Sequence, residues 1–175
     1  GRRVRDLRKD IRLKVFSLFA NVGYLAGMSL PHPHAQLMAL PLVPRELEHR
    51  QGFWQGHYAR TGRCPLCDLL AEEGGDGRRV VWASEHWLAV VPFAAPVSHQ
   101  MVLLPRRHVS NWLDLSREAV EEWSRIVPRL FGVLDGMLER PDLHWILHGL
   151  GAEQAPWQHC WMEITPVLGL IGGVE

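Results

Sequence analysis

The sequence predicts an α+β fold in which helices cover an antiparallel sheet. Short apolar segments that alternate with charged or turn residues indicate strands at 11–19, 34–43, 80–83, 87–91, 100–104, 143–148 and 159–165. A long segment with helical spacing of apolar residues separates the first five strands from the last two. With 175 residues, 47% of them apolar and 22% charged, the chain can bury such a core.

Two helices are expected before the third strand. Proline suits the first turn of a helix, so Pro44 marks the start of a helix that runs to about Tyr58. A short helix should follow the cysteine pair of segment 61–70, and the glycine-rich residues 74–77 should form a loop.

The long helix is expected between Ser116 and Arg140. Ser116 is a suitable N-cap, and Pro128 should kink the helix. Its core-facing residues are expected to be Val120, Trp123, Val127, Leu130, Phe131 and Leu134.

The charge pattern argues against nucleic-acid and membrane partners. The formal net charge is zero, and the basic stretch of residues 1–14 is interrupted by Asp6 and Asp10, which favours a solvated face over a phosphate-binding arm. No apolar run reaches the roughly 18 residues of a membrane span. The sequence also lacks the apolar core of a signal peptide, so we expect a cytoplasmic protein.

Two histidines and a glutamine alternate at the start of the second strand. Side chains of alternate residues in an extended segment share one side, so His32, His34 and Gln36 could line one face. A neutral imidazole can attack phosphorus, and a glutamine amide can donate to a phosphate oxygen. Taken alone, a pair of histidines with one residue between them is more typical of a turn with two surface histidines.

Cys64 and Cys67 have the spacing of a metal-binding knuckle. Such a pair alone does not distinguish zinc binding from redox chemistry, although the redox role favours a thioredoxin-like context that is not evident here. A tetrahedral zinc ion would need two further ligands from the ten histidines. The third cysteine, Cys160, is expected to be a buried free thiol.

Residues 19–36, FANVGYLAGMSLPHPHAQ, resemble the active-site segment of the galactose-1-phosphate uridylyltransferase family, whose fold is histidine-triad-like. The resemblance implies that His34 is the nucleophile that becomes nucleotidylated and that His32 binds a structural metal. It assigns Gln36 a contact with the transferred phosphate. Other residues that the resemblance places near the nucleotide phosphates are Asn21, Gly27 and Ser29.

Within that family, the chain resembles the ADP-glucose phosphorylase-like subgroup in particular. In that subgroup the second of two tandem repeats also binds zinc, which implies a Cys2His2 site formed by Cys64, Cys67, His108 and His159. His148 matches a family histidine and is expected to be structural or to line a pocket. Trp161 stands where some members have a further metal-binding histidine, so we expect no additional metal there.

The resemblance divides the chain into three parts. Residues 1–44 would be the last strands of a first repeat with the HPHxQ motif, 45–60 a linking helix, and 61–175 the second repeat. The first repeat's own CxxC pair would then lie upstream, so His32 would lack its metal partners within this chain.

The implied function is nucleotidyl transfer between a nucleotide sugar and a sugar 1-phosphate, in galactose and related carbohydrate metabolism. The expected protein is a homodimer that contains zinc. Two alternatives stay open: an ADP-glucose phosphorylase, which would transfer the adenylyl group to phosphate, and a zinc-stabilised binding module without catalysis. The sequence does not separate UDP from ADP sugars, or galactose from glucose.

Overall fold

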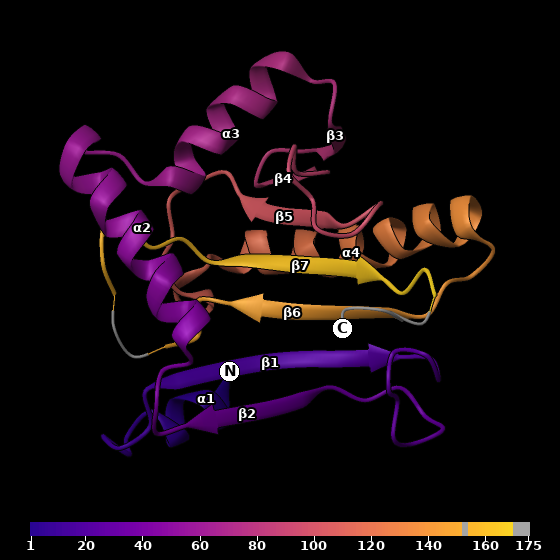
Figure 1. Cartoon of the computed structure of the whole chain (residues 1–175), viewed down its shortest axis with the longest axis horizontal. Helices are drawn as coiled ribbons and strands as arrows, with labels where there is room; N and C mark the ends of the chain where they lie inside the picture. The colour runs from indigo at the N-terminus through magenta and orange to yellow at the C-terminus, as the bar shows by residue number, and fades with distance from the viewer. Residues whose placement is uncertain (152–153, 170–175) are drawn as a thin grey trace, which may run out of the picture.

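Seven strands form one antiparallel sheet in the computed structural model, which describes residues 1–151 and 154–169. The strand order across the sheet is β2-β1-β6-β7-β5-β4-β3 (Figure 1). The strands are β1 (Val15–Val22), β2 (Gln36–Leu40), β3 (Val80–Ala83), β4 (Trp87–Val90), β5 (Met101–Pro105), β6 (Leu143–His148) and β7 (Trp161–Pro166).

Helices lie on both faces of this sheet (Figure 1). They are α1 (Arg2–Leu7), α2 (Arg45–Thr61), α3 (Pro65–Asp76), the 3-10 helix η1 (Trp112–Asp114) and α4 (Arg117–Leu138). The α+β class and the long helix are therefore confirmed. No helix in the described part of the chain has both the length and the apolar character needed to cross a membrane.

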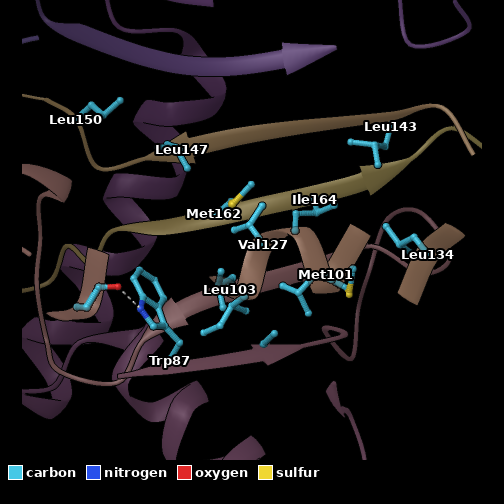
Figure 2. Packing of buried hydrophobic residues seen from close by; sticks show 14 of the residues in the cluster. Trp87, Met101, Leu103, Val127, Leu134, Leu143, Leu147, Leu150, Met162 and Ile164 are labelled. Atoms are coloured by element: carbon cyan, nitrogen blue, oxygen red, sulfur yellow. Dashed lines mark hydrogen bonds between the residues drawn. The ribbon is translucent and has the colours of Figure 1, made fainter. Parts of the chain in front are cut away.

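The larger core lies between α4 and the sheet. Val127 and Leu130 of α4 join Leu103, Met162 and Ile164 of the central strands in one cluster of buried side chains (Figure 2). The indole Nε1 of Trp87 donates a hydrogen bond of 2.8 Å to the carbonyl oxygen of Ala119, which attaches the first turn of α4 to β4. Ser116 caps α4 as expected, because its hydroxyl oxygen accepts from the Ala119 amide.

A smaller core lies on the opposite face, under α2 and α3. Leu70 of α3 and Trp161 of β7 pack with three aliphatic residues of β4 and β5. Trp54 of α2 meets Trp161 edge to face, with 5.1 Å between ring centroids. This packing fixes the start of α3 against the strands that carry the candidate metal ligands.

The hairpins β1–β2 and β6–β7 share one register. Phe19 pairs with Gln36, and Ile146 pairs with Glu163, so the same offset of 127 residues relates both partners. Phe19 also pairs with Ile146, its equivalent in the other hairpin. The two hairpins are therefore related by a local two-fold axis at the centre of the β1–β6 contact. The shared register supports the division into two repeats, which stays a proposal.

Several boundaries differ from the sequence-based expectation. The strand expected at 11–19 begins only at Val15, and the basic segment before it contains the unexpected helix α1. Helix α3 continues through the expected glycine loop and ends where Gly77 adopts a left-handed conformation. Val120 of α4, expected in the core, is exposed.

Candidate functional site

The candidate metal ligands gather where α3 begins. Cys64 is the N-cap residue of α3, and Cys67 lies in its first turn. His108 follows β5 in the chain, and His159 precedes β7, which is hydrogen-bonded to β5. Each neighbouring element therefore brings one or two ligands to the same end of the sheet.

The four side chains form a compact group whose ligand atoms all lie within 4.8 Å of one another. Cys67 Sγ lies 3.3 Å from His108 Nδ1 and 3.6 Å from His159 Nδ1. Cys64 Sγ lies 4.0 Å from His159 Nδ1. Tetrahedral ligands at ordinary zinc distances would be about 3.6 Å apart, so the arrangement fits a zinc-sized ion.

The ring of His159 is oriented as a metal ligand requires. Its Nε2 lies 3.0 Å from the carbonyl oxygen of Pro105. Because a carbonyl oxygen only accepts, Nε2 carries the proton and Nδ1 presents its lone pair to the two cysteines. His159 and Cys64 are both buried, so this half of the group is shielded from water.

The two thiols of the knuckle differ in acidity. A hydrogen bond from Cys67 lowers the pKa of Cys64 to about 4, although burial opposes the shift. The same interaction, together with burial, raises the pKa of Cys67 well above its usual range. One thiolate is thus available first, and a bound cation would favour loss of the second proton.

Asp68 holds α2 and α3 together beside the knuckle. It accepts a 2.8 Å hydrogen bond from His57 Nε2 and also pairs with Arg63. Hydrogen bonds with Arg63, which has the larger effect, and with His57 lower the pKa of the Asp68 carboxyl group. Asp68 and His57 support the site rather than bind a ligand, and sequence reasoning did not single out Asp68.

The HPHxQ segment leads into β2 at the opposite end of the sheet (Figure 1). His34 Nδ1 lies 3.0 Å from the carbonyl oxygen of His32, so Nδ1 donates the proton and Nε2 is left with its lone pair in the neutral ring. His34 is half-buried, whereas His32 and Gln36 are exposed. Within the described residues, His32 belongs to no group of three or more metal-ligating side chains.

A turn between β1 and the HPHxQ segment carries Gly27 and Ser29. Asn21, near the end of β1, donates from Nδ2 to the Gly27 carbonyl oxygen over 3.5 Å. Gly27 has a φ of +78°, a conformation that favours glycine, and Ser29 is exposed in the same loop. The structure thus connects Asn21 with Gly27.

Asp142 anchors this loop to the second hairpin. Its carboxylate accepts from the Leu25 amide, and a Cβ on Gly23 would lie 1.9 Å from its Oδ1. Only glycine fits at position 23 in this arrangement. Sequence reasoning missed Asp142, because its contact with Leu25 spans more than 100 residues and no local sequence pattern indicates it.

His148 occupies the position in the second hairpin that Asn21 occupies in the first. The offset of 127 residues also relates Trp161 to His34 and Glu163 to Gln36. The His148 ring stacks on Trp161 with centroids 4.1 Å apart, and its Nε2 lies 3.4 Å from Glu163 Oε2. His148 thus packs against Trp161 and also lines a cavity of about 560 Å³ beside α2.

Comparison with known proteins gives two groups of relatives. The chain is 35% identical over 138 residues to the galactose-1-phosphate uridylyltransferase of Thermotoga maritima, an alignment that covers 79% of this chain and 43% of that protein. It is 26% identical over 178 residues to the ADP-glucose phosphorylase of Arabidopsis thaliana, covering 99% and 49%. This chain is a relative of the galactose-1-phosphate uridylyltransferases. No family model matches it.

Solved structures of galactose-1-phosphate uridylyltransferase-like proteins share the fold. A GalT-like protein from Arabidopsis thaliana superposes with a TM-score of 0.87 at 26% identity, covering 98% of this chain and 57% of that one. An ADP-glucose phosphorylase from the same plant, solved with bound ADP-glucose, also reaches 0.87 at 25% identity, covering 98% and 56%. The chain spans about half the length of the curated relatives that it matches.

Proposed function

We propose that the protein containing this chain is a nucleotidyltransferase that acts through a nucleotidyl-histidine on His34. The hydrogen bond from His34 Nδ1 to the His32 carbonyl carries this proposal, because it leaves Nε2 as the nucleophilic atom. The relation to galactose-1-phosphate uridylyltransferases supports the same role.

In the first step, His34 Nε2 attacks the α-phosphorus of a nucleotide sugar. The N–P bond forms as the bond from phosphorus to the bridging oxygen breaks, and a sugar 1-phosphate leaves with that electron pair. Gln36 donates its amide to a phosphate oxygen, while Asn21, Gly27 and Ser29 surround the phosphates. In the second step, a phosphate oxygen of the acceptor attacks the same phosphorus and releases His34.

Two acceptors fit this scheme. A hexose 1-phosphate would make the protein a uridylyltransferase, as the Thermotoga relative is named. Inorganic phosphate would make it an ADP-glucose phosphorylase, an alternative favoured by alignment of 99% of the chain with the Arabidopsis enzyme. We favour the uridylyltransferase activity because more of the relatives are named galactose-1-phosphate uridylyltransferase.

We further propose that Cys64, Cys67, His108 and His159 bind zinc in a structural role. All four protein ligands are present in the group, so no position is left for a catalytic water. Zinc here would hold α3 against β5 and β7 and supply no step of the reaction. Soluble nucleotide sugars and sugar phosphates are the proposed partners, in a homodimeric cytoplasmic protein.

Intact-protein mass spectrometry tests the nucleophile. The longest natural form of the protein is incubated with UDP-glucose or ADP-glucose, beside His34→Ala and a control, His49→Ala, which changes an exposed histidine of α2. We expect one UMP or AMP on the wild type and the control, and none on His34→Ala. A folded wild type that binds zinc but forms no adduct would favour the non-catalytic module.

A further inference from the structure

A histidine of the second hairpin touches the candidate nucleotide site of the first. His144 of β6 is the cross-strand partner of Asn21 in β1, so their side chains point to the same face of the sheet. His144 Nδ1 lies 3.0 Å from Asn21 Oδ1. Gln36 shares this face, because its partner Phe19 is two residues from Asn21.

The direction of both hydrogen bonds of Asn21 follows from the carbonyl at Gly27. A carbonyl oxygen only accepts, so the NH2 end of the Asn21 carboxamide must face Gly27. The amide oxygen of Asn21 therefore faces His144, and His144 Nδ1 must carry the proton. One continuous path of hydrogen bonds then runs from His144 through Asn21 to the loop.

His144 belongs to an inner strand of the sheet, unlike the loop that Asn21 contacts. Strand β6 is paired on one side with β1 and on the other with β7, and the Cα partner of His144 in β7 is Thr165. The loop from Gly23 to Ser29 is exposed over most of its length. A donor fixed on an inner strand can therefore set the orientation of Asn21, and Asn21 in turn holds Gly27.

We propose that His144 is a positioning residue for nucleotidyl transfer. It fixes the Asn21 carboxamide so that the loop around Gly27 keeps the shape that receives the nucleotide phosphates. This inference rests on the proposed function, since it needs a nucleotide at that loop. His144 touches no reacting atom, and its effect passes through Asn21 alone.

The test uses two substitutions at 144 in the longest natural form of the protein. His144→Gln keeps a donor for Asn21, whereas His144→Leu removes it. We expect His144→Leu to slow nucleotidylation of His34, followed by rapid quench, about tenfold, as for one lost hydrogen bond. The nucleotidylation rate of His144→Gln should stay within about threefold of the wild-type rate. The melting temperatures of both variants should stay within about 2 °C of the wild-type value.

A double-mutant cycle separates positioning from a general structural role. In an Asn21→Ala background the partner of His144 is already gone, so His144→Leu should have no further effect on the rate. A His144→Leu variant as fast as the wild type, or one whose effect adds fully to that of Asn21→Ala, overturns the inference. So does a His144→Gln variant as slow as His144→Leu.

Failure of the proposed function gives a different result. If the wild type forms no adduct on His34, calorimetry with UDP-glucose and ADP-glucose decides the inference by binding alone. Weaker binding by His144→Leu that His144→Gln restores supports the positioning role without the transfer chemistry. Equal binding by all three proteins, or no binding by any, overturns it.

Discussion

Cys160 differs from the other two cysteines in its surroundings. It has no exposed surface, and burial raises the pKa of its thiol to about 12. At neutral pH it is therefore neither accessible nor ionised, and only the thiolate form attacks reagents such as maleimides. With N-ethylmaleimide and peptide mass spectrometry, we expect no label on Cys160 in the native protein and full label after denaturation.

The knuckle provides an internal comparison for this labelling. Cys64 and Cys67 should resist the reagent while metal is bound and react after a chelator removes it, with Cys160 still unlabelled. Labelling of Cys160 before Cys67 under native conditions would show that the interior around β7 opens more readily than its packing indicates.

The pair His148 and Glu163 should make stability depend on pH. Burial lowers the pKa of His148 below its usual 6.5, and the nearby His148 ring, with Nε2 3.4 Å from Glu163 Oε2, lowers the pKa of Glu163. Below pH 6.5 the unfolded chain thus binds a proton at His148 more readily than the folded chain does, so the free energy of unfolding decreases as the pH is lowered. The contribution of Glu163 is present above its usual 4.5 and is lost at lower pH.

Urea unfolding between pH 7.5 and 5.0 measures this dependence. His148→Gln removes the titrating ring, so its free energy of unfolding should change less with pH than that of the wild type. His49→Ala, at an exposed histidine, should follow the wild type. Parallel curves for all three proteins would show that His148 does not resist protonation in the folded state.

At the scale of elements, the glycines of α3 have opposite roles. Gly75 lies inside the helix, where an added Cβ would meet no atom within 4 Å, whereas Gly77 ends the helix with a φ of +73°. Gly75→Ala should therefore stabilise the protein by about 0.5–1 kcal/mol, because alanine favours helix. Gly77→Ala should cost about 1 kcal/mol, because only glycine adopts that conformation without strain.

Thermal unfolding of the two variants tests this contrast. The substitution is the same at both positions, so a difference in melting temperature reports the backbone conformation. If both variants melt together, α3 ends before Gly75 in solution and the expected glycine loop would be correct.

The same glycines show what a local pattern leaves out. Two consecutive glycines predict a loop, but Glu73 is buried and accepts two hydrogen bonds of 3.0 Å from Arg79, which holds the last turn of α3 in place. Residues 143–148 were placed correctly because apolar alternation is a local property. On α4, helical spacing identified Leu130 correctly but not the exposed Val120, because spacing does not fix the edge of the buried stripe.

The candidate sites show the same contrast between local sequence patterns and contacts that form only in the folded chain. His34, Cys64 and Cys67 lie in short motifs, so the sequence could indicate them, and the family resemblance supplied His108 and His159. The supporting residues Asp68, Asp142 and His144 act through contacts that only the folded chain creates. For His144 the partner is 123 residues away, and no motif contains both.

At the scale of the whole molecule, the two candidate sites lie at opposite ends of one sheet. Strands β1 and β7 are both antiparallel to β6 and so run in the same direction. The HPHxQ segment follows the end of β1, whereas His159 precedes the start of β7 (Figure 1). Because the sheet separates them, we expect the metal group to affect the other site through the stability of the fold.

Removal of the proposed zinc should therefore lower the stability of the fold before it affects the proposed transfer reaction. The four ligands join α3 to the segments beside β5 and β7, so a chelator or Cys67→Ser should lower the melting temperature by about 10 °C or more. Below that lower melting temperature, the metal-free protein should still label His34 at a rate near that of the metal-bound protein. A chelator should not destabilise Cys67→Ser further, which separates loss of the site from nonspecific effects of the reagent. Loss of His34 labelling in a metal-free protein that is still folded would mean that the metal group shapes the distant loop directly, through the strands that join the two ends of the sheet.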